Sequence, residues 1–179
     1  MAGSFNPPTL AHRELVEAAR FHVEEVLCVL PRVFPHKEYF GATLAQRLSM
    51  LAQSAPASIA VSDQGLFLDI ARECREHYDP ATKLYFLCGT DAAERILHWD
   101  YGRPGVVDEM LSEFELLVAA RGGMFEPPAQ YRDRIKPLPL RDGLHHVSST
   151  EVRHRIKTGR PWEHLVPPEI VERVREIYS

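Results

Sequence analysis

The stretch Gly3–His12 (GSFNPPTLAH) combines residue types that suit a bound phosphate group. The glycine lets the backbone approach a ligand closely, and the two prolines form a rigid, extended approach to a helix. Thr9 is a suitable N-cap, which places His12 near the third helical position. There the imidazole would lie beside open backbone amides whose partial positive charge favours an anion. The stretch predicts a phosphate site with a hydrogen-bond donor; a turn before an ordinary capped helix is the alternative.

A second helix start with similar chemistry occurs in Val147–Arg153 (VSSTEVR). Ser148 and Glu151 have the spacing of a capping box, which explains both without any ligand. Capping does not account for Thr150 and Arg153. A hydroxyl and a guanidinium near a helix N-terminus also suit a polyphosphate. This second helix start favours a nucleotide site over the structural alternative.

Strands and helices that would position these residues alternate along the chain. Three nearly continuous apolar runs predict parallel strands covered on both faces. A short run at 59–61 predicts a further strand, and 135–140 is a weaker candidate because Pro137 and Pro139 interrupt it. The alternation predicts βαβ units in one α/β domain, 1–179, whose C-terminal portion (about 149–179) is helical. The predicted strands are 25–30, 59–61, 83–88, 115–120 and 135–140, and the predicted helices are 10–21, 43–53, 66–77, 91–97, 106–111, 150–157 and 168–178.

Composition narrows the class of protein. The chain has 179 residues, of which 45% are hydrophobic and 26% charged, as in an ordinary globular protein. The net charge of −4 argues against non-specific nucleic-acid binding. The three cysteines lack metal-ligand or redox spacing, and Cys28 and Cys88 are expected to be reduced core thiols. No apolar run approaches membrane-spanning length, so we expect a cytoplasmic protein, with its oligomeric state left open.

In this order, the two helix starts resemble the signatures of the H-x-G-H nucleotidylyltransferase superfamily. They are most similar to those of the bacterial nicotinate-mononucleotide adenylyltransferases, G-G-S-F-[DN]-P-x-[HT]-x-G-H and I-S-S-T-x-x-R. Ala11 replaces a glycine of the first signature. Weaker similarities in the sequence between these two helix starts extend the resemblance over almost the whole chain. They are Leu30-Pro31, Pro35-His36-Lys37, Gln46-Arg47, Cys88-Gly89-Thr90-Asp91, Trp99 and Ala120-Arg121-Gly122.

The resemblance implies a Rossmann-like, doubly wound parallel sheet. The family has a central strand directly before the Gly-Ser-Phe turn, whereas only Met1 and Ala2 precede Gly3 here. We therefore expect a sheet whose first central strand is absent, which would leave backbone groups of the neighbouring strands unpaired. We also expect the natural start to lie upstream of Met1; the alternative is that another segment fills the gap in the sheet.

Adenylyl transfer is the activity that the resemblance implies. The phosphate of an acceptor, nicotinate mononucleotide in NAD biosynthesis, attacks the α-phosphorus of ATP, and pyrophosphate leaves with Mg²⁺ bridging the phosphates. Such a reaction mainly needs in-line positioning and stabilisation of developing charge. ATP and a phosphorylated acceptor would be the partners, without nucleic acid or membrane.

The resemblance also implies roles for individual residues. His12 would donate a hydrogen bond to the α-phosphate, Thr9 would shape the same site, and Lys37 would hold the acceptor phosphate. The implied acceptor-binding residues are His36, Lys37 and Trp99, and no residue is assigned as a metal ligand. The implied ATP-binding residues are Gly3, Ser4, Phe5, His12, Gly89, Asp91, Arg121, Ser149, Thr150 and Arg153.

Several of these roles have alternatives. Asp91 could cap the helix after Gly89, Trp99 could pack on the surface, and Lys37 could be a solvated loop lysine. The stretch 62–69 lacks the Tyr-Thr element with which the nicotinate enzymes read the pyridine carboxylate. The chain could instead be an adenylyl- or cytidylyltransferase for another phosphorylated acceptor, such as phosphopantetheine, or a non-catalytic nucleotide-binding homologue.

Overall fold

The computed structural model describes residues 1–34, 41–120, 125–140, 143–144 and 146–179. All five predicted strands are present, and so are all seven predicted helices, with small shifts at their ends. The last predicted helix begins as a 3₁₀ turn, Pro168–Ile170. The strands are β1 (Leu27–Pro31), β2 (Ser58–Ser62), β3 (Tyr85–Gly89), β4 (Glu115–Ala119) and β5 (Ile135–Leu138). The helices are α1 (Leu10–Ala19), α2 (Leu44–Ser54), α3 (Phe67–Arg75), α4 (Thr90–His98), α5 (Val106–Glu113), α6 (Ser149–Lys157) and α7 (Val171–Tyr178).

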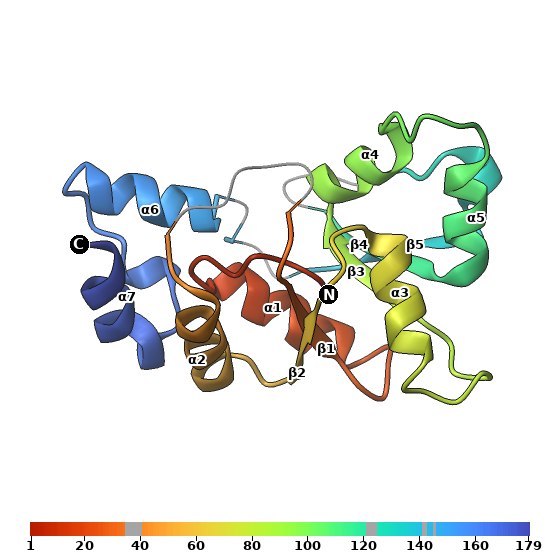
Figure 1. The fold of residues 1–179 in the computed structure, drawn as a ribbon. Coiled ribbons are helices and arrows are strands. Elements are labelled where there is room, and N and C mark those ends of the chain that lie inside the picture. Colours follow the sequence, from red (N-terminus) through yellow and green to blue (C-terminus); the bar gives the residue numbers. More distant parts are fainter. Residues whose placement is uncertain (35–40, 121–124, 141–142, 145) are drawn as a thin grey trace.

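The strands form two parallel sheets of a Rossmann-like α/β fold (Figure 1). One sheet pairs β1 with β2, and the other has the order β3-β4-β5. All five residues of β4 are buried, as its continuous apolar run predicts for a central parallel strand. Pro137 is accommodated in β5, which pairs with β4 alone in the described part of the chain and therefore lies at a sheet edge.

The segment before the first loop pairs with β1 but does not join the two sheets. The Val29 N–H donates to the Met1 carbonyl at 2.9 Å, and the Gly3 N–H donates to the Val29 carbonyl at 3.1 Å. The Met1 ammonium donates to the Leu27 carbonyl at 2.8 Å. Within the described ranges, β3 pairs only with β4. The expectation of a sheet without its central strand is thus confirmed.

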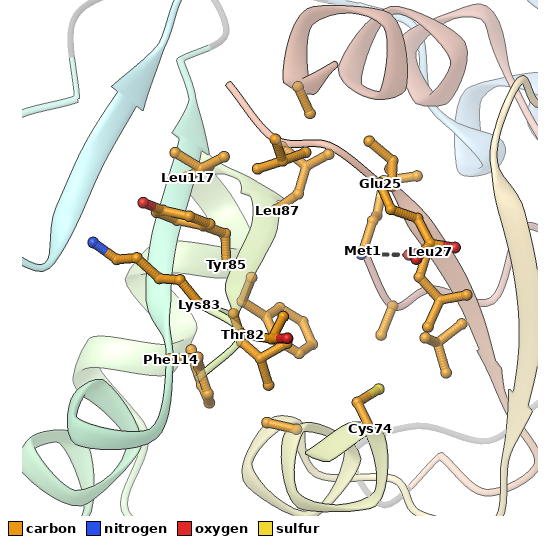
Figure 2. Close-up of a pocket in the computed structure, with 18 of the residues that line it drawn as sticks. Met1, Glu25, Leu27, Cys74, Thr82, Lys83, Tyr85, Leu87, Phe114 and Leu117 are labelled. Carbon is orange, nitrogen blue, oxygen red and sulfur yellow. Dashed lines mark hydrogen bonds between the residues drawn. The ribbon is translucent and has the colours of Figure 1, made fainter. Parts of the chain in front are cut away.

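A cavity of about 500 Å³ lies between β1 and β3, and Leu27 and Tyr85 are on its opposite walls (Figure 2). The Leu84 carbonyl accepts the Glu115 N–H at 3.0 Å, so the backbone groups of Leu84 point toward β4. Backbone groups alternate in direction along a strand, and those of Tyr85 and Leu87 therefore point toward the cavity. The cavity thus has the place of a missing middle strand.

The C-terminal helices pack against the beginning of the fold. Val152, Trp162 and Val174 form one buried cluster with Ala11 of α1 and Met50 of α2. In Figure 1, α6 and α7 lie at one end of the molecule and α4 and α5 at the other. Cys28 and Cys88 are buried free thiols, as predicted. In the part that the structure describes, no helix is long and apolar enough to cross a membrane.

Candidate functional site

The loop from Ser4 to Pro8 connects the segment beside β1 to the start of α1. Because Met1–Gly3 runs parallel to β1, the loop leaves at the carboxyl end of that strand, where Rossmann-like folds bind ligands. Phe5 has a positive φ of 45° and is buried. Its ring centroid lies 5.1 Å from that of His12. The turn therefore folds back onto the first turn of α1.

Thr9 is the N-cap of α1 and His12 is the third helical residue, as predicted. The Thr9 N–H donates to His12 Nδ1 at 3.0 Å, and Thr9 Oγ1 lies 2.8 Å from the same nitrogen. Since Nδ1 accepts a backbone hydrogen bond, the proton of the neutral imidazole is on Nε2. The helix start thus sets the tautomer of His12 and gives the imidazole an N–H donor on its other nitrogen.

The second predicted helix start, α6, lies against the same loop. The Ser149 hydroxyl donates to the Pro7 carbonyl at 2.8 Å, and the Arg153 guanidinium donates to the Asn6 carbonyl. Arg153 Nη2 also donates to the Thr150 hydroxyl at 3.3 Å. The fold therefore brings together two helix N-termini that are about 140 residues apart in sequence.

Only one half of the predicted capping box is formed at α6. The Ser148 hydroxyl accepts the Glu151 N–H at 3.1 Å, as an N-cap should. The Glu151 carboxylate accepts from Arg155 Nε at 2.6 Å, and this hydrogen bond lowers the pKa of Glu151. Glu151 therefore has a structural partner, but that partner is Arg155 and not the N-cap backbone, so the predicted capping role of its side chain is wrong.

Arg47 of α2 also holds the loop, which the sequence analysis did not foresee. It is only 3% exposed, and its Nη1 donates to the Ser4 carbonyl at 3.0 Å. The signal was available in the sequence: Arg47 shares the buried face of α2 with Met50, Leu51 and Ser54. A charged residue at helical spacing within an apolar stripe needs a buried polar partner.

Asn6 is the second loop residue whose role the sequence analysis missed. Its side chain is buried, and Oδ1 accepts the Ala42 N–H at 3.2 Å. The same oxygen accepts a hydrogen bond from the Tyr178 hydroxyl. The loop is thus held by α2, α6 and α7 together, and no local sequence pattern could connect these three helices.

Gly89, Asp91 and Trp99 lie together at α4. Gly89 ends β3 and is the N-cap of α4, so Asp91 is the second helical residue and not the cap. Trp99 follows the helix and is 47% exposed. Asp91 and Trp99 line the same surface hollow along α4. The strand that directly precedes α4 is β3, and α1 packs against β3.

Three predicted site residues, His36, Lys37 and Arg121, lie outside the described residues. Of the predicted site residues that the structure describes, none lines the large cavity between β1 and β3. Among the described residues, no group of three or more His, Cys, Asp or Glu side chains could hold a metal ion.

Comparison with known proteins decides the family. The cytidylyltransferase-like family matches residues 1–155, a range that includes both helix starts. The chain belongs to the cytidylyltransferase-like family. This family member is therefore a nucleotidyltransferase, and the resemblance drawn from the two helix starts is confirmed.

Relatives of this cytidylyltransferase-like protein extend over its whole length. A probable nicotinate-nucleotide adenylyltransferase of Moorella thermoacetica is 30% identical, and the alignment covers 98% of this chain and 87% of the relative. A protein of the same description from Stenotrophomonas maltophilia is 29% identical over 96% of this chain and 91% of the relative. Plasmodium falciparum nicotinic acid mononucleotide adenylyltransferase complexed with NaAD has the same fold. It is 17% identical with a TM-score of 0.74, over 98% of this chain and 92% of that one.

Proposed function

We propose that this protein transfers the adenylyl group of ATP to nicotinate mononucleotide and releases pyrophosphate. The observation that carries the proposal is the meeting of two helix N-termini at one loop, with the His12 donor beside it. Two helix starts offer backbone amides and positive ends of helix dipoles to one polyphosphate. The names of the full-length relatives support ATP and nicotinate mononucleotide as the substrates.

In the proposed reaction, a phosphate oxygen of the acceptor forms a bond to the α-phosphorus of ATP. The bond from that phosphorus to the oxygen of the departing pyrophosphate breaks. His12 Nε2–H donates to the α-phosphate as negative charge develops, and Thr9 keeps the imidazole in this tautomer. No proton has to move in this step, so orientation and charge stabilisation are the contribution of the protein.

The other predicted residues complete the proposed site. Ser149, Thr150 and Arg153 at the start of α6 would contact the β- and γ-phosphates of ATP. When bound with ATP, Mg²⁺ would supply positive charge that offsets the negative charge of the phosphates. Backbone contacts to the bound nucleotide would come from Gly3, Ser4 and Phe5. Further contacts to ATP would come from Gly89, Asp91 and Arg121. The acceptor would be held by His36, Lys37 and Trp99.

The second candidate function is nucleotidyl transfer to a different phosphorylated acceptor. It is suggested by the contacts of Ser62 and Asp63 at the end of β2. The Ser62 hydroxyl donates to the Glu73 carboxylate and accepts the Gln64 N–H at 3.0 Å. Next to it, Asp63 is paired with Arg32 at 2.8 Å. These groups have partners within the chain, in the stretch where the Tyr-Thr element would read a pyridine carboxylate.

Pyrophosphate release tests the proposal. The enzyme is incubated with ATP, Mg²⁺ and nicotinate mononucleotide, nicotinamide mononucleotide or phosphopantetheine, and the products are identified by mass. A parallel series replaces ATP with CTP. We expect nicotinate adenine dinucleotide and pyrophosphate in equal amounts. If only another combination of nucleotide and acceptor gives product, that combination replaces the proposed substrates. If the protein binds ATP but releases no pyrophosphate with any acceptor, the result supports the non-catalytic alternative.

A further inference from the structure

Asn6 is the most constrained residue of the loop before α1. Its side-chain amide is buried, and Oδ1 accepts from the Ala42 N–H and from the Tyr178 hydroxyl, while its backbone carbonyl accepts from Arg153. The Asn6 amide also packs closely against Gly41, where an added Cβ would lie 2.9 Å from both Asn6 Oδ1 and Asn6 Nδ2. Contacts from three parts of the chain therefore hold Asn6: Ala42 and Tyr178 at its carboxamide oxygen and Arg153 at its backbone carbonyl.

Tyr178 is the last residue of α7, 172 residues away from Asn6. Its ring packs with the apolar cluster that contains Val174 and Trp162, so the helix end is held in place independently of the hydroxyl. The hydroxyl is thus an addition to a ring that already packs. A phenylalanine would fill the same space but could not donate to Asn6.

Asn6 is close to the proposed catalytic group along the chain, and its neighbour Phe5 lies against the His12 ring. Only Pro7 and Pro8 lie between Asn6 and the Thr9 cap, and the ring centroid of Phe5, the residue before Asn6, lies 5.1 Å from that of His12. A displacement of Asn6 would be transmitted to the cap hydrogen bond that orients the imidazole. Displacements of about 1 Å in a catalytic group can lower turnover by about 100-fold.

We infer that Tyr178 is a positioning residue for nucleotidyl transfer: its hydroxyl holds Asn6, and through Asn6 it orients the loop and His12. The expected effect of Tyr178 on turnover rests on the proposed function. The expected effect of Tyr178 on the His12 imidazole does not depend on that function. The C-terminal helix is accordingly part of the machinery that shapes the site, with Tyr178 acting through Asn6.

The test compares Tyr178→Phe with Tyr131→Phe in the whole protein. Tyr131 is the matched control, since its hydroxyl donates to Asp108 at 3.0 Å, on the surface beside α5. We expect Tyr178→Phe to lower kcat about 10-fold, the effect of one lost hydrogen bond, with KM for ATP changed less than about 2-fold. Nitrogen NMR of the His12 imidazole should show shifted resonances in Tyr178→Phe and unchanged ones in Tyr131→Phe.

Replacing Tyr178 by 4-aminophenylalanine separates the hydrogen bond from packing. This side chain keeps a donor at the same ring position, and it should restore both kcat and the His12 resonances. Unchanged His12 resonances in Tyr178→Phe, or a loss of kcat that 4-aminophenylalanine does not restore, would overturn the inference. If the wild-type protein turns over no substrate, the proposed function fails, whereas the His12 resonances still decide whether Tyr178 positions the imidazole.

Discussion

His12 is the side chain on which turnover should depend most strongly. His12→Ala is expected to lower kcat by about 10²- to 10³-fold, because a preorganised donor to the α-phosphate is lost. Stability should fall by only about 1 kcal/mol, since Thr9 still caps the helix. Pyrophosphate release and thermal denaturation check the two expectations. His77→Ala, at an exposed histidine after α3, is the control, and near-normal turnover of the His12 variant would remove His12 from the mechanism.

Gly41 should be intolerant of any side chain because of Asn6. Its φ is +106°, and an added Cβ would lie 2.9 Å from the Asn6 amide. Gly143 is a matched control with a φ of +105° and nothing within 4 Å of an added Cβ. Backbone strain should cost each alanine variant about 1–2 kcal/mol. Only Gly41→Ala should lose further stability and kcat, and equal effects in the two variants would show that crowding at Asn6 has no consequence.

Glu115, the first residue of β4, links three neighbouring segments by charge. Its carboxylate is almost fully buried and is paired with Lys83 at 2.8 Å and Lys136 at 3.1 Å. Burial alone would raise the pKa of Glu115, but the hydrogen bonds from the two lysines outweigh burial and lower that pKa below 4.5. The ionised carboxylate therefore stabilises the strand starts, away from the proposed site at their carboxyl ends.

The pH dependence of stability tests this pairing. A carboxyl with a lowered pKa in the folded state stabilises the protein above pH 4.5, and this contribution is lost as the pH falls through the lower, folded pKa. At pH about 7, Glu115→Gln should lower Tm by about 3–6 °C. The difference in Tm between the variant and the wild type should shrink below pH 4.5, while a difference that is the same at all pH values would contradict the assignment.

Helix and strand positions were predictable because each depends on local patterns. Continuous apolar runs placed β3 and β4, and a cap followed by helical periodicity placed α1 and α6. Some ends coincided and the others differed by up to three residues, since fraying and capping depend on tertiary contacts. Asp91 shows the limit of this reasoning: its spacing is compatible with a cap, but the backbone gives that position to Gly89.

Taken as a whole, the molecule has two sheets where one continuous sheet could form. The Met1 ammonium is buried beside the cavity, and this burial lowers its pKa because the charged form is desolvated. Backbone groups of Tyr85 and Leu87 face the same cavity. An extended apolar segment between β1 and β3 would pair these groups and bury apolar surface on both faces.

Joining about five apolar, β-branched residues to the amino side of Met1 should therefore stabilise the protein. We expect Tm to rise by several degrees, through removal of the buried ammonium and filling of the cavity. Hydrogen exchange at the Tyr85 and Leu87 amides should slow. A segment of the same length made of glycine, serine and aspartate is the control, and equal Tm values for the two extended proteins would contradict the expectation.

The sequence by itself determined the order of strands and helices and the two helix starts with His12, Thr150 and Arg153. These features follow from periodicity, capping and motif, which act within a few residues. Only the tertiary structure decided that α6 lies against the loop of α1 and that Arg47 and Tyr178 hold it. Such contacts join residues 43 to 172 positions apart. They depend on packing between helices, which no local pattern encodes.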